Sequence, residues 1–320
     1  MNIEQFISND AIKNELADAM LHRTVPHAVI IEGAKGTGKR TLAQIIAASA
    51  VCTSQEQHPC GICSGCLKAQ QGIHPDIFIA DGNSTGGISI SIIRQIRSDA
   101  YIKPNEAPTR VFMLFNCDKM LAPAQNAFLK ILEEPPANVM FILTVTSANM
   151  LLETVRSRSR IYSLFPADTE EAAAYLSGVF PDKSAEELKN AVSASGGNIG
   201  QAIERIQNGG EESRLLAEEI ITAVTGRDEY RLLTLTNQLT KDRQFAGAVL
   251  NSMLELSHEC LKAAIGVRVH SAAAEEVSAK LSKRRCYAMT EVISNACGIL
   301  NTNVNLAFFS TWLCAQLSMR

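Results

Sequence analysis

The sequence lacks a strong excess of charge of either sign. Its 320 residues contain 30 Lys and Arg against 33 Asp and Glu, which gives a net charge of −3. A chain this close to balance has no overall field that would draw it onto nucleic acid or an anionic membrane. Any contact with DNA is therefore expected from a local patch or through partner subunits.

Long apolar runs and targeting signals are also missing. No stretch approaches the roughly 18 consecutive apolar residues of a membrane-spanning helix. The first residues, MNIEQFISNDAIKNEL, are polar and mixed in charge, whereas a secretory signal is basic and then apolar. We therefore expect a cytoplasmic protein without a membrane partner.

The first 166 residues alternate short apolar segments with helical patterns. Strands are predicted at 27–32, 76–80, 110–115, 139–146 and 160–165. Helices are predicted between them at 38–52, 89–101, 121–134 and 148–156. Strands that alternate with helices indicate right-handed crossovers and a parallel sheet, so an α/β domain is predicted over residues 1–166.

After residue 166 the strand pattern ends and helical periodicity takes over. Three short helices are predicted over 167–210, with Asp168 or Thr169 as the first cap. The remaining residues, 211–320, are almost entirely helical by period and predict an all-α bundle. The sequence thus divides into an α/β domain, a small helical domain and a helical bundle.

A phosphate-binding motif of the form G-x-x-x-x-G-K follows the first predicted strand and opens a helix. Its residues are Gly33, Gly36, Gly38 and Lys39. In such a loop the backbone amides and the lysine face phosphate oxygens, and a Ser or Thr after the lysine ligates Mg²⁺. Here that position is Arg40, and Thr41 follows one helical step, about 100°, too late.

A second part of the hydrolytic apparatus is also missing. An active enzyme has an acidic pair at the end of a neighbouring strand, but here the strand VFMLF is followed by Asn116. Phe115 and Asn116 stand where the two acids belong, and Asp118 is expected to lie too far along to replace them. Because phosphoryl transfer depends on these groups, we expect no hydrolysis and little or no functional nucleotide binding. Binding without hydrolysis and a working ATPase remain the alternatives.

Four of the nine cysteines lie within fifteen residues, in the pattern C-x7-C-x2-C-x2-C. They are Cys52, Cys60, Cys63 and Cys66. Four thiolates from a tight turn suit a tetrahedral Zn²⁺ site without an open position, which is structural rather than catalytic. An iron–sulphur cluster and a metal-free thiol set are the alternatives. His58 and His74 are expected to be loop residues rather than ligands, and the other cysteines are expected to be inert buried thiols.

Three segments together resemble a known family. They are the cysteine segment running into GIHPDIFIADG (72–82), AQNAFLKILEEPP (124–136) and ETVRSRSR (153–160). In this order they are similar to the AAA+ subunits of the bacterial DNA polymerase III clamp loader. The resemblance implies a RecA-like P-loop domain over 1–166 with a zinc-binding insertion at 52–66, a lid domain over 167–210 and a collar over 211–320.

Within that family, the chain is most similar to the delta-prime type, in which the phosphate loop and acid pair are degraded. GGNIGQA also places Gly200 where motor subunits carry a nucleotide-sensing arginine. The resemblance further implies that Arg158 is an arginine finger, offered in trans to the ATP of an adjacent motor subunit. The exposed side of the helix at 124–134, including Glu133 and Glu134, is expected to contact another subunit.

The expected function is that of a non-motor, stator subunit without ATPase activity of its own. Its expected partners are motor subunits and the clamp-opening delta subunit, and through them the sliding clamp and primed DNA. The main alternative is an active motor ATPase of the gamma/tau type. A zinc-dependent nucleic-acid-binding module is a third possibility, which the mild net acidity opposes.

Overall fold

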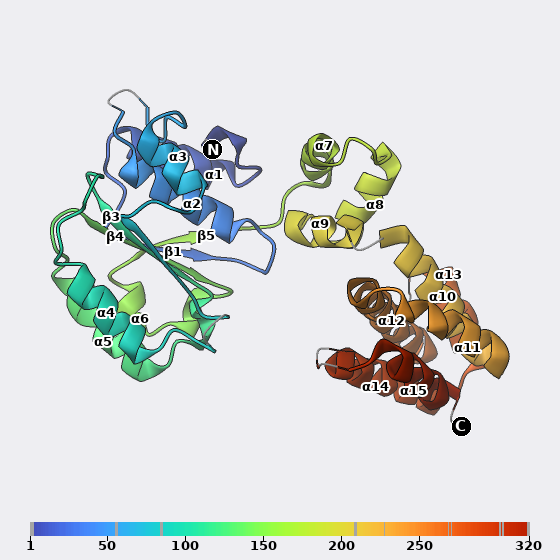
Figure 1. The fold of residues 1–320 in the computed structure, drawn as a ribbon. Helices are drawn as coiled ribbons and strands as arrows, with labels where there is room; N and C mark the ends of the chain where they lie inside the picture. The colour runs from blue at the N-terminus through green and yellow to red at the C-terminus, as the bar shows by residue number, and fades with distance from the viewer. Residues whose placement is uncertain are drawn as a thin grey trace. The chain divides into compact units, whose positions relative to one another are not determined.

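The computed structural model describes residues 3–54, 57–83, 86–207, 210–226, 228–267, 269, 271–300, 302 and 304–318. The chain forms two compact units, Met1–Ala202 and Ile203–Arg320 (Figure 1). Each unit is described by itself below.

The first unit is built on a five-stranded sheet in the order β2-β3-β4-β1-β5, and every pair of neighbouring strands is parallel. The strands are β1 (Ala28–Glu32), β2 (Ile77–Asp81), β3 (Arg110–Phe115), β4 (Val139–Val145) and β5 (Arg160–Ser163). All five lie within two residues of the predicted strands. The predicted parallel α/β architecture is confirmed.

Alternate residues of these strands build a separate core on each face of the sheet. Val29 and Ile31 of β1 pack with helices α1 (Asp10–Leu21) and α2 (Lys39–Val51). Ala28 and Ile30 pack with α4 (Ile90–Asp99), α5 (Ala122–Glu133) and α6 (Glu153–Arg156). Figure 1 shows α1 and α2 on one side of the sheet, together with the short α3 (Ser64–Gln70), and α4 to α6 on the other. The helices therefore cover both faces.

One predicted helix is broken in the structure. Instead of a helix over 148–156, a 3-10 turn, η3 (Ala148–Met150), is followed by extended backbone at Leu151 and Leu152 and then by the four-residue α6. The buried side chain of Gln125 accepts a hydrogen bond from the Leu152 amide at 2.7 Å and donates to the Met120 carbonyl. This long-range bond takes an amide that a continuous helix would have used internally. The first residues of the chain also form helices that the sequence pattern did not predict, η1 (Ile3–Gln5) and α1.

The three short helices predicted after residue 166 are confirmed. They are α7 (Thr169–Val179), α8 (Ala185–Ala194) and α9 (Ile199–Gln207). Asp168 caps α7, and Ser184 caps α8 in a reciprocal capping box with Glu187. The predicted end of the third helix falls partly outside the described residues, since Asn208 and Gly209 are not among them.

The second unit is helical, as predicted. Its helices are α10 (Gly210–Gly226), α11 (Glu229–Asn237), α12 (Arg243–Ala264), α13 (Ala272–Lys280), α14 (Lys283–Leu300) and α15 (Leu306–Ser318). A 3-10 turn, η4 (Gln238–Thr240), follows α11, and the first unit has a similar turn, η2 (Cys117–Lys119), after β3. They share one apolar core that includes Ile220, Leu250, Ile293 and Phe309. No helix in the described part of the chain is long and apolar enough to cross a membrane. The division into three domains at residues 166 and 210 stays a prediction.

Candidate functional site

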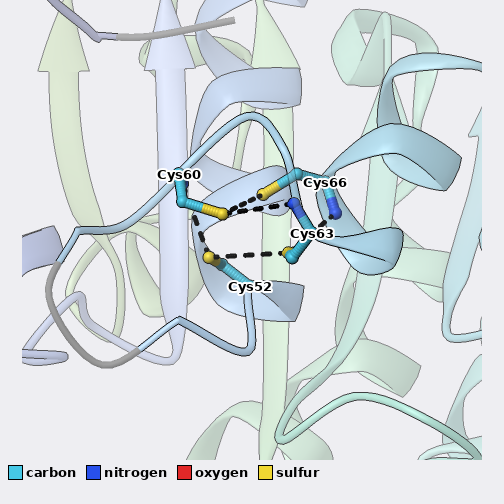
Figure 2. Close-up of side chains that lie close together, drawn as sticks. All are labelled: Cys52, Cys60, Cys63 and Cys66. Carbon is cyan, nitrogen blue, oxygen red and sulfur yellow. Dashed lines mark hydrogen bonds between the residues drawn. The ribbon is translucent and has the colours of Figure 1, made fainter.

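The cysteine cluster is assembled from the end of one helix and the start of the next. Cys52 follows the last residue of α2, Cys60 lies in the connecting loop, and Cys63 caps the N-terminus of α3, which contains Cys66. Figure 2 shows the four sulphur atoms turned toward one another. The turn is held by amides that donate to sulphur: Cys63 to Cys60 at 3.4 Å and Cys66 to Cys63 at 3.4 Å.

The spacing of the sulphur atoms fits a tetrahedral metal ion. All four lie within 4.8 Å of one another, with Cys60 and Cys66 at 4.0 Å and Cys52 and Cys63 at 3.9 Å. Zn–S bonds of about 2.3 Å in a tetrahedron place sulphur atoms about 3.8 Å apart. The four predicted cysteines therefore form one group with the donor set and geometry of a structural metal site.

Burial and the amide donors act in opposite directions on these thiols. Burial raises the pKa of Cys52 and Cys66. At Cys63 burial acts in the same direction, but hydrogen bonds from amides and from neighbouring thiols outweigh it and lower the pKa to about 6. A cation that binds all four as thiolates must therefore displace protons from the buried cysteines.

The two nearby histidines do not join the cysteine group. Among the described residues, the group that could hold a metal consists of the four cysteines. His58 and His74 are both buried, and His74 Nδ1 accepts a hydrogen bond from the Asp76 amide at 3.0 Å. The Asp76 carboxylate accepts three further amide hydrogen bonds, from Asn105, Glu106 and Ala107, at 2.7–2.9 Å. Asp76 therefore ties the segment after α3 to residues 105–107, which precede β3.

The phosphate-binding motif adopts a loop between β1 and α2. Gly36 and Gly38 have φ values of 90° and 88°, in the region that favours glycine, and Gly38 immediately precedes the helix. Lys39 does not extend into an open site, because its amine donates to the carbonyl oxygens of Gly33 and Ala34. Burial lowers the pKa of Lys39, and the charge of Asp118 opposes this effect.

Arg40 stands directly after Lys39, where a Mg²⁺-ligating hydroxyl is expected. Its guanidinium forms an ion pair with Asp81 at the end of β2 and lies over the Phe115 ring, 4.3 Å from the centroid. Asn116 donates to the other Asp81 oxygen at 2.7 Å. Burial alone would raise the pKa of Asp81, but hydrogen bonds from Asn116 and the Asn83 amide, together with Arg40, lower it. Arg40, Asp81, Phe115 and Asn116 thus form a polar and aromatic cluster.

Asp118 is engaged elsewhere. One of its oxygens accepts hydrogen bonds from both the amide and the hydroxyl of Thr146, just after β4. The carboxylate therefore fixes the connection after β4. Whether it could replace the missing acids stays a prediction.

Helix α9 packs directly on the phosphate loop. The Asn198 side chain donates to the Lys35 carbonyl at 2.7 Å, and the Gly200 amide donates to the Gly36 carbonyl at 2.9 Å. A Cβ atom at Gly200 would lie 2.6 Å from the Gly36 Cα, closer than two such atoms approach. The position where the resemblance expects a nucleotide-sensing arginine is therefore in backbone contact with the loop and has no room for a side chain.

Arg158 lies on the surface just after α6. Its side chain is 36% exposed, forms an ion pair with Glu133 at 2.8 Å, and donates to the Thr154 carbonyl at 2.9 Å. The two neighbouring arginines have other contacts: Arg156 donates to Asn149, and Arg160 binds the Glu15 carboxylate through two nitrogens. Of the three arginines, Arg158 is the one paired with the exposed side of α5.

Comparison with known proteins identifies the family to which the first unit is related. Residues 8–168, half of the chain, match the model of a family described as DNA polymerase III, delta subunit. The chain belongs to this family.

Individual proteins similar to this chain are also subunits of bacterial DNA polymerase III. The chain is 29% identical over 214 residues to DNA polymerase III subunit delta' of Escherichia coli, which covers 66% of this chain and 64% of that protein. It is 30% identical to the Haemophilus influenzae subunit delta' over 59% of this chain and 57% of that protein. It is also 30% identical to the Mycobacterium tuberculosis subunit gamma/tau, over 52% of this chain and 30% of that protein. The matches thus span less than two thirds of the relatives' length, and the two delta' matches both exceed half of this chain.

A solved structure of a gamma subunit-related protein from Thermotoga maritima aligns over 95% of this chain and 98% of its own, at 16% identity and a TM-score of 0.46.

The sequence pattern identified the loop and the cysteines of this DNA polymerase III delta-family chain, but it missed Asp81, the partner of Arg40. One signal was available. Asp81 ends a predicted strand of a parallel sheet, and residues at the carboxyl ends of such strands gather at one edge. In the structure Asp81 lies in register with Phe115 on the next strand.

Proposed function

We propose that this chain is a non-motor subunit of a bacterial replicative clamp loader, of the delta-prime type. It would assemble with motor subunits and the clamp-opening delta subunit in the cytoplasm, and through them load the sliding clamp on primed DNA. We further propose that it has no ATPase activity of its own.

The observation that carries the non-motor role is the contact between Arg40 and Phe115. One residue stands in place of the Mg²⁺-ligating hydroxyl and the other in place of an acid. A guanidinium at this point opposes the entry of a divalent cation, and Phe115 offers it no ligand. Metal ions and positioned acids supply most of the catalysis in phosphoryl transfer, so their loss leaves the loop without a route to turnover.

The packing of α9 on the loop supports the same role. In a motor subunit, a helical lid has to respond to the nucleotide that lies between it and the phosphate loop. Here Asn198 and Gly200 already bind the backbone of the loop. The chain would accordingly serve as a fixed element against which the motor subunits move.

Arg158 would supply the chemistry that the chain contributes to its neighbour. A guanidinium offered in trans neutralises charge that develops on the transferred phosphoryl group, an effect of about 10³–10⁵ in rate where such fingers act. Its planar, permanently charged group suits phosphate better than lysine does. Exposure of about a third of the side chain leaves it accessible to another subunit.

The cysteine cluster would hold one structural Zn²⁺. The donors are four thiols with no open position, so the ion would brace the segment between α2 and α3 rather than take part in a reaction. Cys52, Cys60, Cys63 and Cys66 would be its ligands.

The test is ATP turnover by a clamp loader reconstituted from this chain and its motor subunits, with primed DNA and clamp. Arg158→Ala should leave assembly intact and sharply lower turnover at the adjoining ATP site, whereas Arg160→Ala, a nearby loss of the same charge, should not. Turnover unchanged by Arg158→Ala would remove the finger role. Mg²⁺-dependent turnover by the isolated chain would favour the motor alternative, and tight, salt-dependent DNA binding by it would favour a nucleic-acid module.

A further inference from the structure

Both terminal nitrogens of Arg158 are engaged within the chain. Nη2 lies 2.8 Å from a carboxylate oxygen of Glu133, and Nη1 donates to the Thr154 carbonyl at 2.9 Å. Glu133 is the last residue of α5, and Thr154 lies in α6. The guanidinium is therefore held between two elements that are packed together in one core.

Glu133 lies at the end of its helix where an acidic side chain is electrostatically unfavourable. The C-terminus of a helix carries partial negative charge and favours Lys, Arg or His over an acid. Yet α5 ends with Glu133, followed by Glu134 and two prolines that cannot continue the helix. An acid held at this end faces an unfavourable local field, which the guanidinium of Arg158 offsets.

We infer that Glu133 is a positioning residue for Arg158, and this inference rests on the proposed finger role. The long arginine side chain is free to adopt many rotamers, and a finger is effective only when it is held in the geometry of the reaction. Nη1 also donates to the Ser157 hydroxyl at 3.4 Å. Nη2 carries a second hydrogen, which remains for a phosphate while Glu133 and Thr154 hold the rest of the group. Glu133 acts through Arg158 and does not itself touch the nucleotide.

The expected effect is modest, because the ion pair is solvent-exposed. Glu133 is 48% exposed, and exposed pairs shift an equilibrium by up to about fivefold. Removing Glu133 should therefore lower the turnover that Arg158 supports by about two- to fivefold, mainly in kcat, since the finger acts in the transition state.

The experiment uses the reconstituted complex and five variants of this chain. Glu133→Ala should lower kcat about two- to fivefold, while Glu133→Gln, which keeps an oxygen within reach of the guanidinium, should restore most of it. Glu186→Ala, which removes an exposed acid from α8, is the control and should match the unaltered complex. In the Arg158→Ala background, Glu133→Ala should cause no further loss, because the two residues act as one unit.

The outcomes separate the two ideas. Unchanged turnover in Arg158→Ala would refute the finger role itself. If Arg158→Ala strongly lowers turnover but Glu133→Ala leaves it unchanged or raises it, the positioning role alone is overturned. The positioning role is also overturned if Glu133→Ala lowers turnover by the same factor with and without Arg158. A rise would mean that the carboxylate competes with phosphate for the arginine. Unfolding midpoints of the isolated variants, expected to be close to that of the unaltered chain, exclude misfolding as the cause.

Discussion

The guanidinium of Arg40 lies over the ring of Phe115, 4.3 Å from its centroid. In the proposed non-motor role these two residues replace a Mg²⁺-ligating hydroxyl and an acid, and in the folded chain they lie in contact. A cation over an aromatic face is a favourable contact, worth about 0.5–1 kcal/mol at an exposed site. The two changes are therefore mutually compatible, and reversing one of them alone leaves an incompatible neighbour in place.

This contact predicts that a single reversion does not restore activity. Arg40→Thr returns a hydroxyl to the position after Lys39 but leaves Phe115 and Asn116 without acids, so Mg²⁺-dependent ATP turnover by the isolated chain should stay at background. Because Arg40 is more than half exposed, the free energy of unfolding should fall by about 1 kcal/mol or less. Sustained turnover in the variant would show that the acid pair is dispensable, and the unaltered chain is the control.

The parts of the site that could be predicted are those set by short separations in sequence. The cysteine spacing and the glycine loop are local patterns, and both appear in the structure where the sequence placed them. The alternation of strands and helices likewise predicted the parallel sheet, because crossovers between parallel strands follow strict rules.

The contacts that complete the site join residues far apart in sequence. Arg40 and Asp81 are 41 positions apart, and neither segment by itself indicates that the two side chains pair. The break between η3 and α6 depends on Gln125, 27 positions before the amide that it binds. Periodicity reports how a segment packs but not which distant polar group will take one of its amides, so a single sequence does not reveal these partners.

The cysteine cluster predicts that each chain binds one zinc ion and that replacing any one of the four cysteines abolishes this binding. Cys60→Ser should abolish stoichiometric zinc, measured by elemental analysis, and should lower the unfolding temperature of the first unit. Cys297→Ser, a change at a half-buried thiol in the second unit, is the matched control and should retain the metal. A metal-free preparation of the unaltered chain with undiminished stability would contradict the site.

Zinc affinity should also depend on pH in a defined direction. Burial raises the pKa of Cys52 and Cys66, so these thiols hold their protons near neutrality and must release them to the metal. Affinity should therefore weaken as pH falls from 8 to 6, measured by competition with a chromogenic chelator. Affinity that is constant over this range would show that the thiols are not the ligands.

The contact between Gly200 and Gly36 predicts that a methyl group added at Gly200 would force the loop and α9 apart. A Cβ at Gly200 would lie 2.6 Å from the Gly36 Cα, so the backbone must move, and overpacking of this kind typically costs about 1–3 kcal/mol. Gly200→Ala should thus destabilise the first unit in chemical unfolding. Gly178→Ala in α7 has open space around it and should be neutral or stabilising by up to about 1 kcal/mol. Equal stability of the two variants would contradict the contact between α9 and the loop.

Asp76 predicts a pH dependence of stability. Burial alone would raise its pKa, but hydrogen bonds from the amides of Asn105, Glu106 and Ala107 lower it. A carboxylate whose pKa is lower in the folded than in the unfolded state stabilises the fold above the unfolded pKa, near 4, and loses that contribution as pH falls through the folded pKa.

Asp76→Asn should therefore reduce the free energy of unfolding by about 1–3 kcal/mol at pH 7, because an amide cannot accept all three bonds. The difference from the unaltered chain should shrink below about pH 4, where Asp76 of the unfolded chain takes up a proton before Asp76 of the folded chain does. Urea unfolding at pH 7, 5 and 3 measures this, with Asp182→Asn at an exposed position as the control. A deficit of the same size at all three pH values would show that the charge of Asp76 does not stabilise the loop, and that the substitution acts through shape alone.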